Sequence, residues 1–257
     1  MPEMPEMAEM PDAMTMATKT LTAKAEPFDS FWELPGNVEG SRRKFQQFYR
    51  HNYLRRFPAD QAARILIIGC GPGYLTDLLL KAGYTNVRGI DSRAEKVRYA
   101  LERELPCQAA EAFPFLEQAA QPFDMICLES ELNHLTKEEI IEFAKLCRRR
   151  LRPGGTLLVH SLNGANPFTG TAALAQNIDH YNTFTDYSLT QALRLGGFED
   201  VTAFPLRNFV FWTNPLNYVG LALERLIELG IRGLYALYAK KHPILTKKFA
   251  AIARNGA

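Results

Sequence analysis

Residues 64–74 read Arg-Ile-Leu-Ile-Ile-Gly-Cys-Gly-Pro-Gly-Tyr, and this stretch decides the fold. The run from Ile65 to Ile68 is short and apolar, which is typical of a strand buried in a parallel sheet. Glycines follow at positions 69, 71 and 73, and a helical pattern begins at Tyr74. A strand, a glycine loop and a helix in this order predict a site where a ligand approaches the backbone and the helix N-terminus closely.

The second strand of this unit, Asn86 to Ile90, ends at an acid. Asp91 stands 22 residues after Gly69, where a carboxylate can accept hydrogen bonds from the ribose hydroxyls of an adenosine. More than one class of adenosine-containing cofactor binds to this arrangement of loop and acid, and dinucleotides are one of them. The dinucleotide fingerprint needs a small residue at the sixth position of its loop, and Tyr74 stands there, so the sequence disfavours a dinucleotide.

Strands and helices alternate along the rest of the chain, which predicts an α/β fold with a parallel sheet. We expect a Rossmann-like, seven-stranded, mostly parallel sheet flanked by helices. Two helix starts carry the pattern of a capping box, Ser92 with Glu95 and Thr136 with Glu139. The expected strands are 64–69, 86–90, 107–110, 123–128, 156–161, one from 198 and one over 244–253, and the expected helices are 74–82, 92–104, 136–151, 188–195 and 215–240.

The domain organisation follows from composition. Residues 1–26 are acidic and rich in Met and Pro, which predicts a disordered tail. Residues 27–58 are expected to form an N-terminal helical cap that ends at Pro58, and residues 59–257 the main domain. Residues 162–185 show neither helical nor strand periodicity, and a connection of this length inside a domain is often functional.

The net charge of +2 hides an uneven distribution. Residues 1–40 carry −6, residues 41–200 carry +2 and residues 201–257 carry +6. The near-neutral middle gives no support for nucleic-acid binding. The acidic start has no apolar signal segment and no stretch is long enough to span a membrane. The four scattered cysteines favour a reducing compartment, so we expect a cytoplasmic protein, with membrane association as the alternative.

The GxGxG loop resembles the first motif of class I S-adenosylmethionine-dependent methyltransferases, along "ILIIGCGPGYLTDLLLKAGYTNVRGID". Further stretches are similar to later motifs of that family. They are "AAEAFPF", "PFDMICLESELNHL", "CRRRLRPGGTLLV" and "TDYSLTQALRLGGFEDV". The resemblance covers roughly residues 60–204 and implies S-adenosylmethionine as cofactor.

The resemblance also implies roles for individual residues. Gly69, Gly71 and Gly73 would approach the methionine part of the cofactor. Asp91 and the adjacent Ser92 would meet the ribose, and Glu111 with the Ala112 backbone the adenine. Glu129 would contact the cofactor amino group or position the substrate. The common Glu-His-Leu that follows the fourth strand is Asn133-His134-Leu135 here, so no role is carried over to position 133.

A hydroxyl acceptor benefits from a base, and histidine suits that task at neutral pH. His180 and His134 are the candidate bases. His134 could instead be a loop residue, and His180 could pack with Tyr181 and Phe184. The candidate substrate contacts are His160, Asn163, Tyr181 and Tyr49, with core or turn roles as alternatives for His160 and Asn163. We expect no metal; Glu129, Glu131 and Asp179 are the acids that would have to converge to bind one.

These features predict methyl transfer to a small molecule or glycan, most simply to a hydroxyl of a sugar or secondary metabolite. The alternatives are N-methylation of a small amine and a non-catalytic cofactor-binding partner protein. Residues 214–243 form a helical insertion before the last strand, with lysines at 240, 241, 247 and 248. This insertion is expected to pack on the domain, to form a homodimer or to make peripheral contact with an anionic membrane.

Overall fold

The computed structural model describes residues 37–129, 132–175, 177–178, 180–208 and 214–256. The expected tail over residues 1–26 lies outside this part of the chain, and the expected cap is described only from residue 37 onward. None of the described helices is both long and apolar enough to cross a bilayer.

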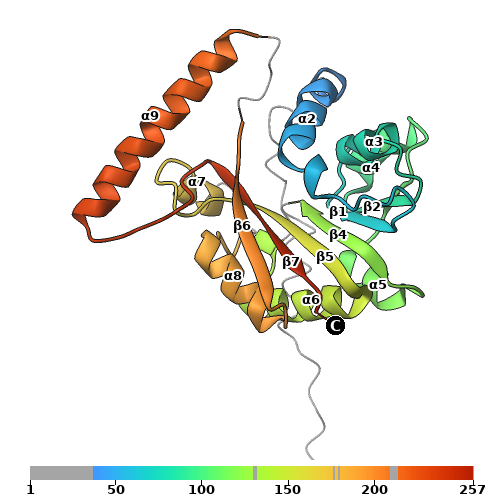
Figure 1. Cartoon of the computed structure of the whole chain (residues 1–257). Helices are drawn as coiled ribbons and strands as arrows, with labels where there is room; N and C mark the ends of the chain where they lie inside the picture. The colour runs from blue at the N-terminus through green and yellow to red at the C-terminus, as the bar shows by residue number, and fades with distance from the viewer. Residues whose placement is uncertain (1–36, 130–131, 176, 179, 209–213, 257) are drawn as a thin grey trace, which may run out of the picture.

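The centre of the fold is a seven-stranded sheet with the order β3-β2-β1-β4-β5-β7-β6 (Figure 1). Its strands are β1 (Ile65–Ile68), β2 (Val87–Asp91), β3 (Cys107–Ala109), β4 (Phe123–Glu129), β5 (Leu151–Leu162), β6 (Asp200–Leu206) and β7 (Lys248–Arg254). The strands β1 to β5 run parallel and β7 is antiparallel to both neighbours. The predicted seven-stranded, mostly parallel sheet is therefore confirmed.

The described helices are α2 (Val38–Asn52), α3 (Tyr74–Lys81), α4 (Ala94–Leu101), α5 (Ala112–Gln118), α6 (Lys137–Arg150), α7 (Gly170–Ala175), α8 (Asp186–Leu195) and α9 (Leu216–Leu237), with short 3-10 turns η1 (Leu54–Arg56) and η2 (Leu132–His134). Helices α2 to α6 and α8 cover the two faces of the sheet. Alternate residues of β1 divide the core, because neighbouring side chains of a strand point to opposite faces. Ile65 and Ile67 pack with α2, α3 and α4, while Leu66 and Ile68 pack with α5, α6 and α8.

Several local predictions differ from the structure. The capping box at Thr136 and Glu139 is confirmed, but the one at Ser92 and Glu95 is wrong. Arg93, one residue later than Ser92, is the N-cap of α4, and its side chain has no acceptor for an amide of the first turn. The strand expected at 156–161 is longer, since β5 begins at Leu151, and its pairing with β4 shifts register near that start.

Two element boundaries, one near each end of the domain, also differ from the prediction. The cap helix α2 ends at Asn52 and continues as the turn η1, so it stops before Pro58. The last strand begins at Lys248, four residues later than expected. The sequence patterns did not predict α5 and α7, because helices of seven and six residues are shorter than the stretch over which a helical period can be recognised.

The N-terminal cap lies across α3. Arg42 forms a buried ion pair with Asp77 at 3.2 Å, and Gln46 donates to the same carboxylate at 2.6 Å. Tyr74 stacks on Phe45 with 4.8 Å between ring centroids and donates its hydroxyl to the Val38 carbonyl at 2.8 Å. The bulky Tyr74 is therefore accommodated under the cap, in the direction away from the strand.

Candidate functional site

The glycine loop after β1 has a backbone that L side chains rarely adopt. Gly69, Gly71 and Gly73 have φ values of 75°, 48° and 78°. A Cβ at Gly71 would meet no atom within 4 Å, so this backbone faces open space. A Cβ at Gly73 would lie 2.7 Å from Leu105 Cδ1 and 3.0 Å from Ala100 Cβ. Gly71 therefore leaves room beside the loop, whereas Gly73 allows α3 to begin against its neighbours.

Asp91 ties this loop to the end of β2. Its Oδ2 accepts the Gly71 N–H at 2.8 Å and its Oδ1 accepts the Arg93 N–H at 2.9 Å. Burial raises the pKa of the Asp91 carboxyl, and the amides of Arg93 and Gly71 act in the opposite direction. A carboxylate has about four lone-pair sites, so these two bonds leave acceptor capacity for the hydroxyls of a ligand.

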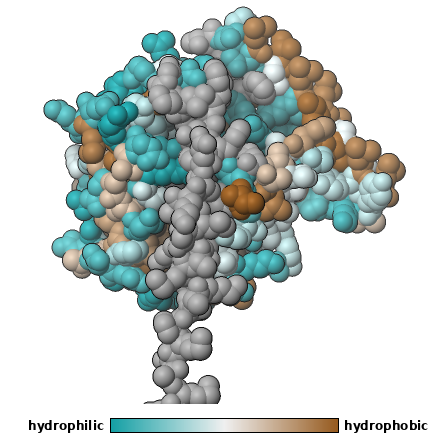
Figure 2. All heavy atoms as spheres, turned by 180° about the vertical axis from the view of Figure 1, so that it is seen from behind, coloured by the Kyte–Doolittle hydropathy of each residue, from teal (hydrophilic) through white to brown (hydrophobic). Residues whose placement is uncertain are grey.

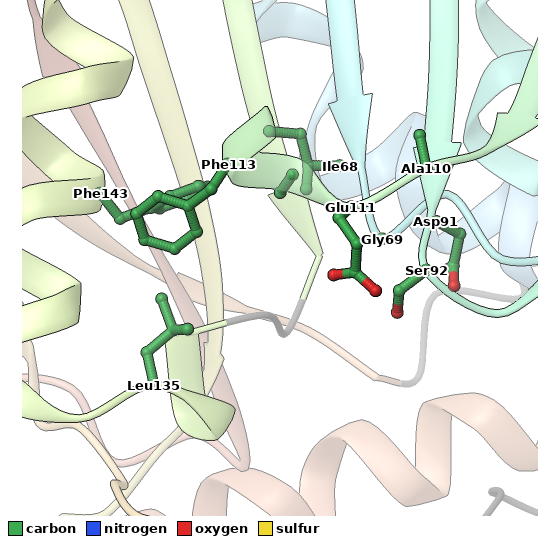
Figure 3. A pocket seen from close by; sticks show the side chains of 10 residues that line it. Ile68, Gly69, Asp91, Ser92, Ala110, Glu111, Phe113, Leu135 and Phe143 are labelled. Atoms are coloured by element: carbon green, nitrogen blue, oxygen red, sulfur yellow. The ribbon is translucent and has the colours of Figure 1, made fainter. Parts of the chain in front are cut away.

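A pocket opens beside the loop, at the carboxyl ends of β1 and β2 (Figure 3). The carboxylates of Asp91 and Glu111 and the hydroxyl of Ser92 lie close together at one end of it, while Phe113, Phe143 and Leu135 form the other. Its lining residues are Ile68, Gly69, Asp91, Ser92, Ala110, Glu111, Ala112, Phe113, Leu135 and Phe143. A ligand with a flat apolar part and a hydroxylated part matches these two ends.

The pocket brings together five of the residues that the sequence assigned to the cofactor: Gly69, Asp91, Ser92, Glu111 and Ala112. Sequence reasoning missed its apolar end, where the rings of Phe113 and Phe143 lie 4.8 Å apart between centroids. Phe143 belongs to the buried stripe of α6, and periodicity alone does not distinguish a core ring from one that also lines a pocket.

Glu129 lies at the end of β4, next to the cap. Its Oε2 accepts a hydrogen bond from Tyr49 Oη at 3.2 Å and lies 3.2 Å from His160 Nδ1. Since a carboxylate can only accept, Nδ1 carries the proton in this pair. Three predicted site residues, Tyr49, Glu129 and His160, thus form one buried cluster that joins the cap to β4 and β5. Tyr53, which the sequence did not indicate, is buried beside Glu129.

The environment of His160 favours its neutral form. Burial lowers the pKa of the His160 imidazole, while Glu129 raises it and Lys248 lowers it further. Its Nε2 is buried and makes no hydrogen bond within the part of the chain that the structure describes. His160 therefore supports Glu129 from one side as a neutral donor.

The two histidines predicted as bases lie in contact. The rings of His134, in η2, and His180 are 4.7 Å apart between centroids and meet edge to face at 74°. The amide of Tyr181 donates to the Asn133 carbonyl at 2.8 Å, which fixes this approach. His134 directly precedes Leu135 of the pocket wall in the chain, but neither histidine is among the residues that line the pocket.

His180 has a defined orientation. Its Nδ1 lies 2.6 Å from the Ala173 carbonyl oxygen, and its Nε2 lies 3.2 Å from the Asn177 amide nitrogen. A carbonyl oxygen only accepts, so Nδ1 carries the proton and Nε2 presents a lone pair to the amide. Asn177 therefore engages the lone pair with which His180 would act as a base.

The remaining predicted substrate contacts differ in environment. Asn163 is fully buried and its amide nitrogen donates to the carbonyls of Ile244 and Thr246 at 3.0 and 2.9 Å. Its Oδ1 accepts the Ala165 N–H at 2.9 Å, so the side chain holds the 244–246 segment, and it is not among the residues that line the pocket beside the glycine loop. Tyr181 is 40% exposed and stays accessible to a ligand.

Among the described residues, no three His, Cys, Asp or Glu side chains group as metal ligands would. Two of the acids that the sequence singled out, Glu131 and Asp179, lie outside those residues.

A Rossmann-like nucleotide site is defined by a mostly parallel sheet, a GxGxG loop, an acid at the end of β2 and a pocket beside them, and this structure has all four. A family described as "Methyltransferase domain" matches residues 41–203. The chain belongs to this methyltransferase family, and the expected class I, S-adenosylmethionine-dependent methyltransferase is confirmed in family and fold.

Curated relatives match the same region. A ubiquinone biosynthesis O-methyltransferase of Caulobacter sp. (strain K31) is 30% identical over 129 residues, which are 45% of this chain and 50% of the relative. A trans-aconitate 2-methyltransferase of Azoarcus sp. (strain BH72) is 34% identical over 107 residues, 41% of this chain and 42% of the relative. The chain thus spans about half the length, or less, of these relatives.

Solved structures share the fold. A SAM dependent methyltransferase from Archaeoglobus fulgidus superposes with a TM-score of 0.66 at 20% identity, over 88% of this chain and 100% of its own. Haemonchus contortus phosphoethanolamine N-methyltransferase 2, solved in complex with S-adenosyl-L-methionine, has a TM-score of 0.55 at 16% identity, over 91% of this chain and 61% of its own. At these identities the likeness concerns the fold alone.

Proposed function

We propose that this protein transfers a methyl group from S-adenosylmethionine to an oxygen of a small acceptor. The observation that carries the proposal is the Asp91 carboxylate, which is bonded to the Gly71 amide and lies at the polar end of a pocket with an apolar far end. The family match supports methyl transfer, and the relatives named as O-methyltransferases support oxygen as the acceptor atom.

The described residues fit this cofactor. Asp91 and Ser92 would hold the ribose hydroxyls, and Glu111 with the Ala112 backbone would meet the polar edge of the adenine. Phe113, Phe143 and Leu135 would cover its apolar faces. Gly71 would let the methionine part approach, since no side chain fills that space. When bound, S-adenosylmethionine supplies an activated methyl group on its sulfonium.

The chain then has to orient the acceptor, exclude water and remove one proton. Alignment of the reacting groups supplies a large part of such a rate enhancement. We assign the proton to the histidine pair, because His134 directly precedes Leu135 of the pocket wall and its ring contacts the ring of His180. Glu129, held by Tyr49 and His160, is assigned to the cofactor amino group or to the substrate.

The acceptor class follows from this assignment. A hydroxyl must lose its proton on methylation, so a base beside the pocket favours hydroxyl acceptors such as those of sugars and secondary metabolites. An amine that arrives neutral needs less help, so N-methylation of a small amine remains the alternative. A non-catalytic partner protein would retain the cofactor pocket but would not need the histidine pair.

The proposal is tested by methyl transfer from labelled S-adenosylmethionine to small sugars, phenols, hydroxy acids and amines. We expect a hydroxyl compound to be labelled, with turnover reduced about 10²- to 10⁴-fold in a His134→Ala/His180→Ala variant. His242→Ala, a change to a partly exposed histidine far along the chain, is the control. Labelling of amines alone, with turnover unaffected in the double variant, would contradict O-methylation. Cofactor binding without labelling of any acceptor would favour the non-catalytic alternative.

A further inference from the structure

The helix α9 stands apart from the sheet at one side of the molecule (Figure 1). It rests on the domain through residues spaced along one face. Glu224 and Glu228 pair with Arg207, and Ile231 is buried against Ala165 and Leu245. One turn further, Tyr235 donates its hydroxyl to the Ala165 carbonyl at 2.7 Å. The face toward the protein is therefore largely polar.

The opposite face of α9 is apolar and open to solvent. Its side chains recur at spacings of three, four and seven residues, which place them on one stripe. Leu216, Val219, Leu223, Leu226, Leu234 and Leu237 are between 53% and 81% exposed. In Figure 2, seen from behind, this apolar stripe runs along the upper right edge of the molecule. The helix thus inverts the usual arrangement, in which the apolar stripe faces the core.

The exposed charged side chains around this stripe are positive. Between residues 216 and 248 the acids are Glu224 and Glu228, and both face Arg207. Arg225 and Arg232 on the helix, and Lys240, Lys241 and Lys247 after it, are exposed. An apolar stripe bordered by cations, with its acids turned inward, complements an anionic lipid surface.

We propose that α9 docks this protein on an anionic bilayer, lying in the plane of the interface with its apolar stripe among the acyl chains. The charged residues at 224, 225, 228 and 232 favour an in-plane position, since they make one side of the helix polar in its middle part. A second copy of the chain is the less favourable occupant. Two such faces would bring Arg225, Arg232 and the lysines together without exposed acids of this segment to balance them. The inference is independent of the proposed chemistry.

The test is co-flotation of the full chain with vesicles of phosphatidylcholine containing phosphatidylglycerol, and with vesicles of phosphatidylcholine alone. We expect binding to the anionic vesicles that weakens as salt rises, and at least tenfold weaker binding to the neutral ones. A Leu226→Glu/Leu234→Glu variant should lose at least tenfold in binding. Leu101→Glu/Leu195→Glu is the matched control, because it changes two exposed leucines by the same charge on α4 and α8.

A Lys240→Glu/Lys241→Glu variant separates the two contributions, since it alters charge without touching the apolar stripe. It should weaken binding to anionic vesicles and leave any residual binding to neutral vesicles unchanged. Absence of flotation with the wild-type chain would overturn the proposal. A second result would also overturn it: light scattering shows a dimer, Leu226→Glu/Leu234→Glu dissociates that dimer, and the chain does not bind vesicles. In that case α9 would be a homodimer interface.

Discussion

The Gly71 N–H donates to Asp91 Oδ2 at 2.8 Å, so the loop after β1 and the acid after β2 form one unit at the carboxyl edge of the sheet. The sequence placed these residues 20 positions apart, and the parallel pairing of β1 with β2 brings them together. A ligand that bonds to Asp91 is therefore held directly over the glycine loop.

Asp91→Asn should weaken the binding of S-adenosylhomocysteine about 10- to 100-fold. The substitution removes the charge that accepts the ribose hydroxyls, and hydrogen bonds to charged groups are worth roughly 1.5–3 kcal/mol. Isothermal titration calorimetry measures this loss. The control is Asp200→Asn, an exposed acid at the start of β6. Wild-type affinity in Asp91→Asn would show that this carboxylate is not a cofactor contact.

Substitutions at two glycines of the loop should affect protein stability and cofactor binding differently. Gly71→Ala and Gly73→Ala both place a Cβ on a left-handed backbone, which costs roughly 1–2 kcal/mol. Gly73→Ala also forces contacts with Leu105 and Ala100, so urea unfolding should show about 1–3 kcal/mol more destabilisation than Gly71→Ala. Gly71→Ala should instead lower cofactor affinity. Equal stability of the two variants would contradict the packing role of Gly73.

The ion pair of Arg42 with Asp77 should hold the cap on α3. Arg42→Ala leaves the Asp77 carboxylate with Lys81 and Gln46 alone, and we expect the free energy of unfolding to fall by about 1–3 kcal/mol. Arg43→Ala, at the exposed neighbouring position, is the control and should change it by less than about 0.5 kcal/mol. If the two variants are equally stable, the pair does not anchor the cap.

His160 should make stability depend on pH. Burial holds its pKa below the ordinary value, so the unfolded chain binds a proton that the folded chain does not. Stability from this group is fully present above the ordinary histidine pKa of about 6.5 and is lost as the pH falls below it. His160→Gln should therefore lose less melting temperature than wild type between pH 7.5 and 5.5, and His242→Gln should behave as wild type. Parallel curves for all three proteins would refute this assignment.

Much of the fold could be predicted because local sequence patterns agreed with the order of strands and helices along the chain. The apolar run of β1, its glycines and Asp91 have fixed positions in a βαβ unit, and Thr136 with Glu139 caps α6 as their spacing indicated. Ser92 with Glu95 has the same spacing and failed, because α4 begins one residue later, with Arg93 as its N-cap. A spacing rule cannot show a shift of one residue in where a helix begins.

The site was predictable where backbone geometry needs a certain residue, and less so where side chains meet across the fold. The contact of His134 with His180, and the cluster of Tyr49, Glu129 and His160, join segments far apart in the chain. The orientation of α9 is a further example. Its apolar period predicts a helix, but only the structure shows that Glu224 and Glu228 face Arg207 and leave the apolar stripe outside.

The central claim is that this pocket holds S-adenosylmethionine. Titration of the full chain with S-adenosylhomocysteine, and separately with NAD, tests it most directly in a calorimeter. We predict saturable binding of one S-adenosylhomocysteine per chain, weakened by Asp91→Asn, and no measurable binding of NAD. Binding of NAD together with an absence of heat from S-adenosylhomocysteine would contradict the account.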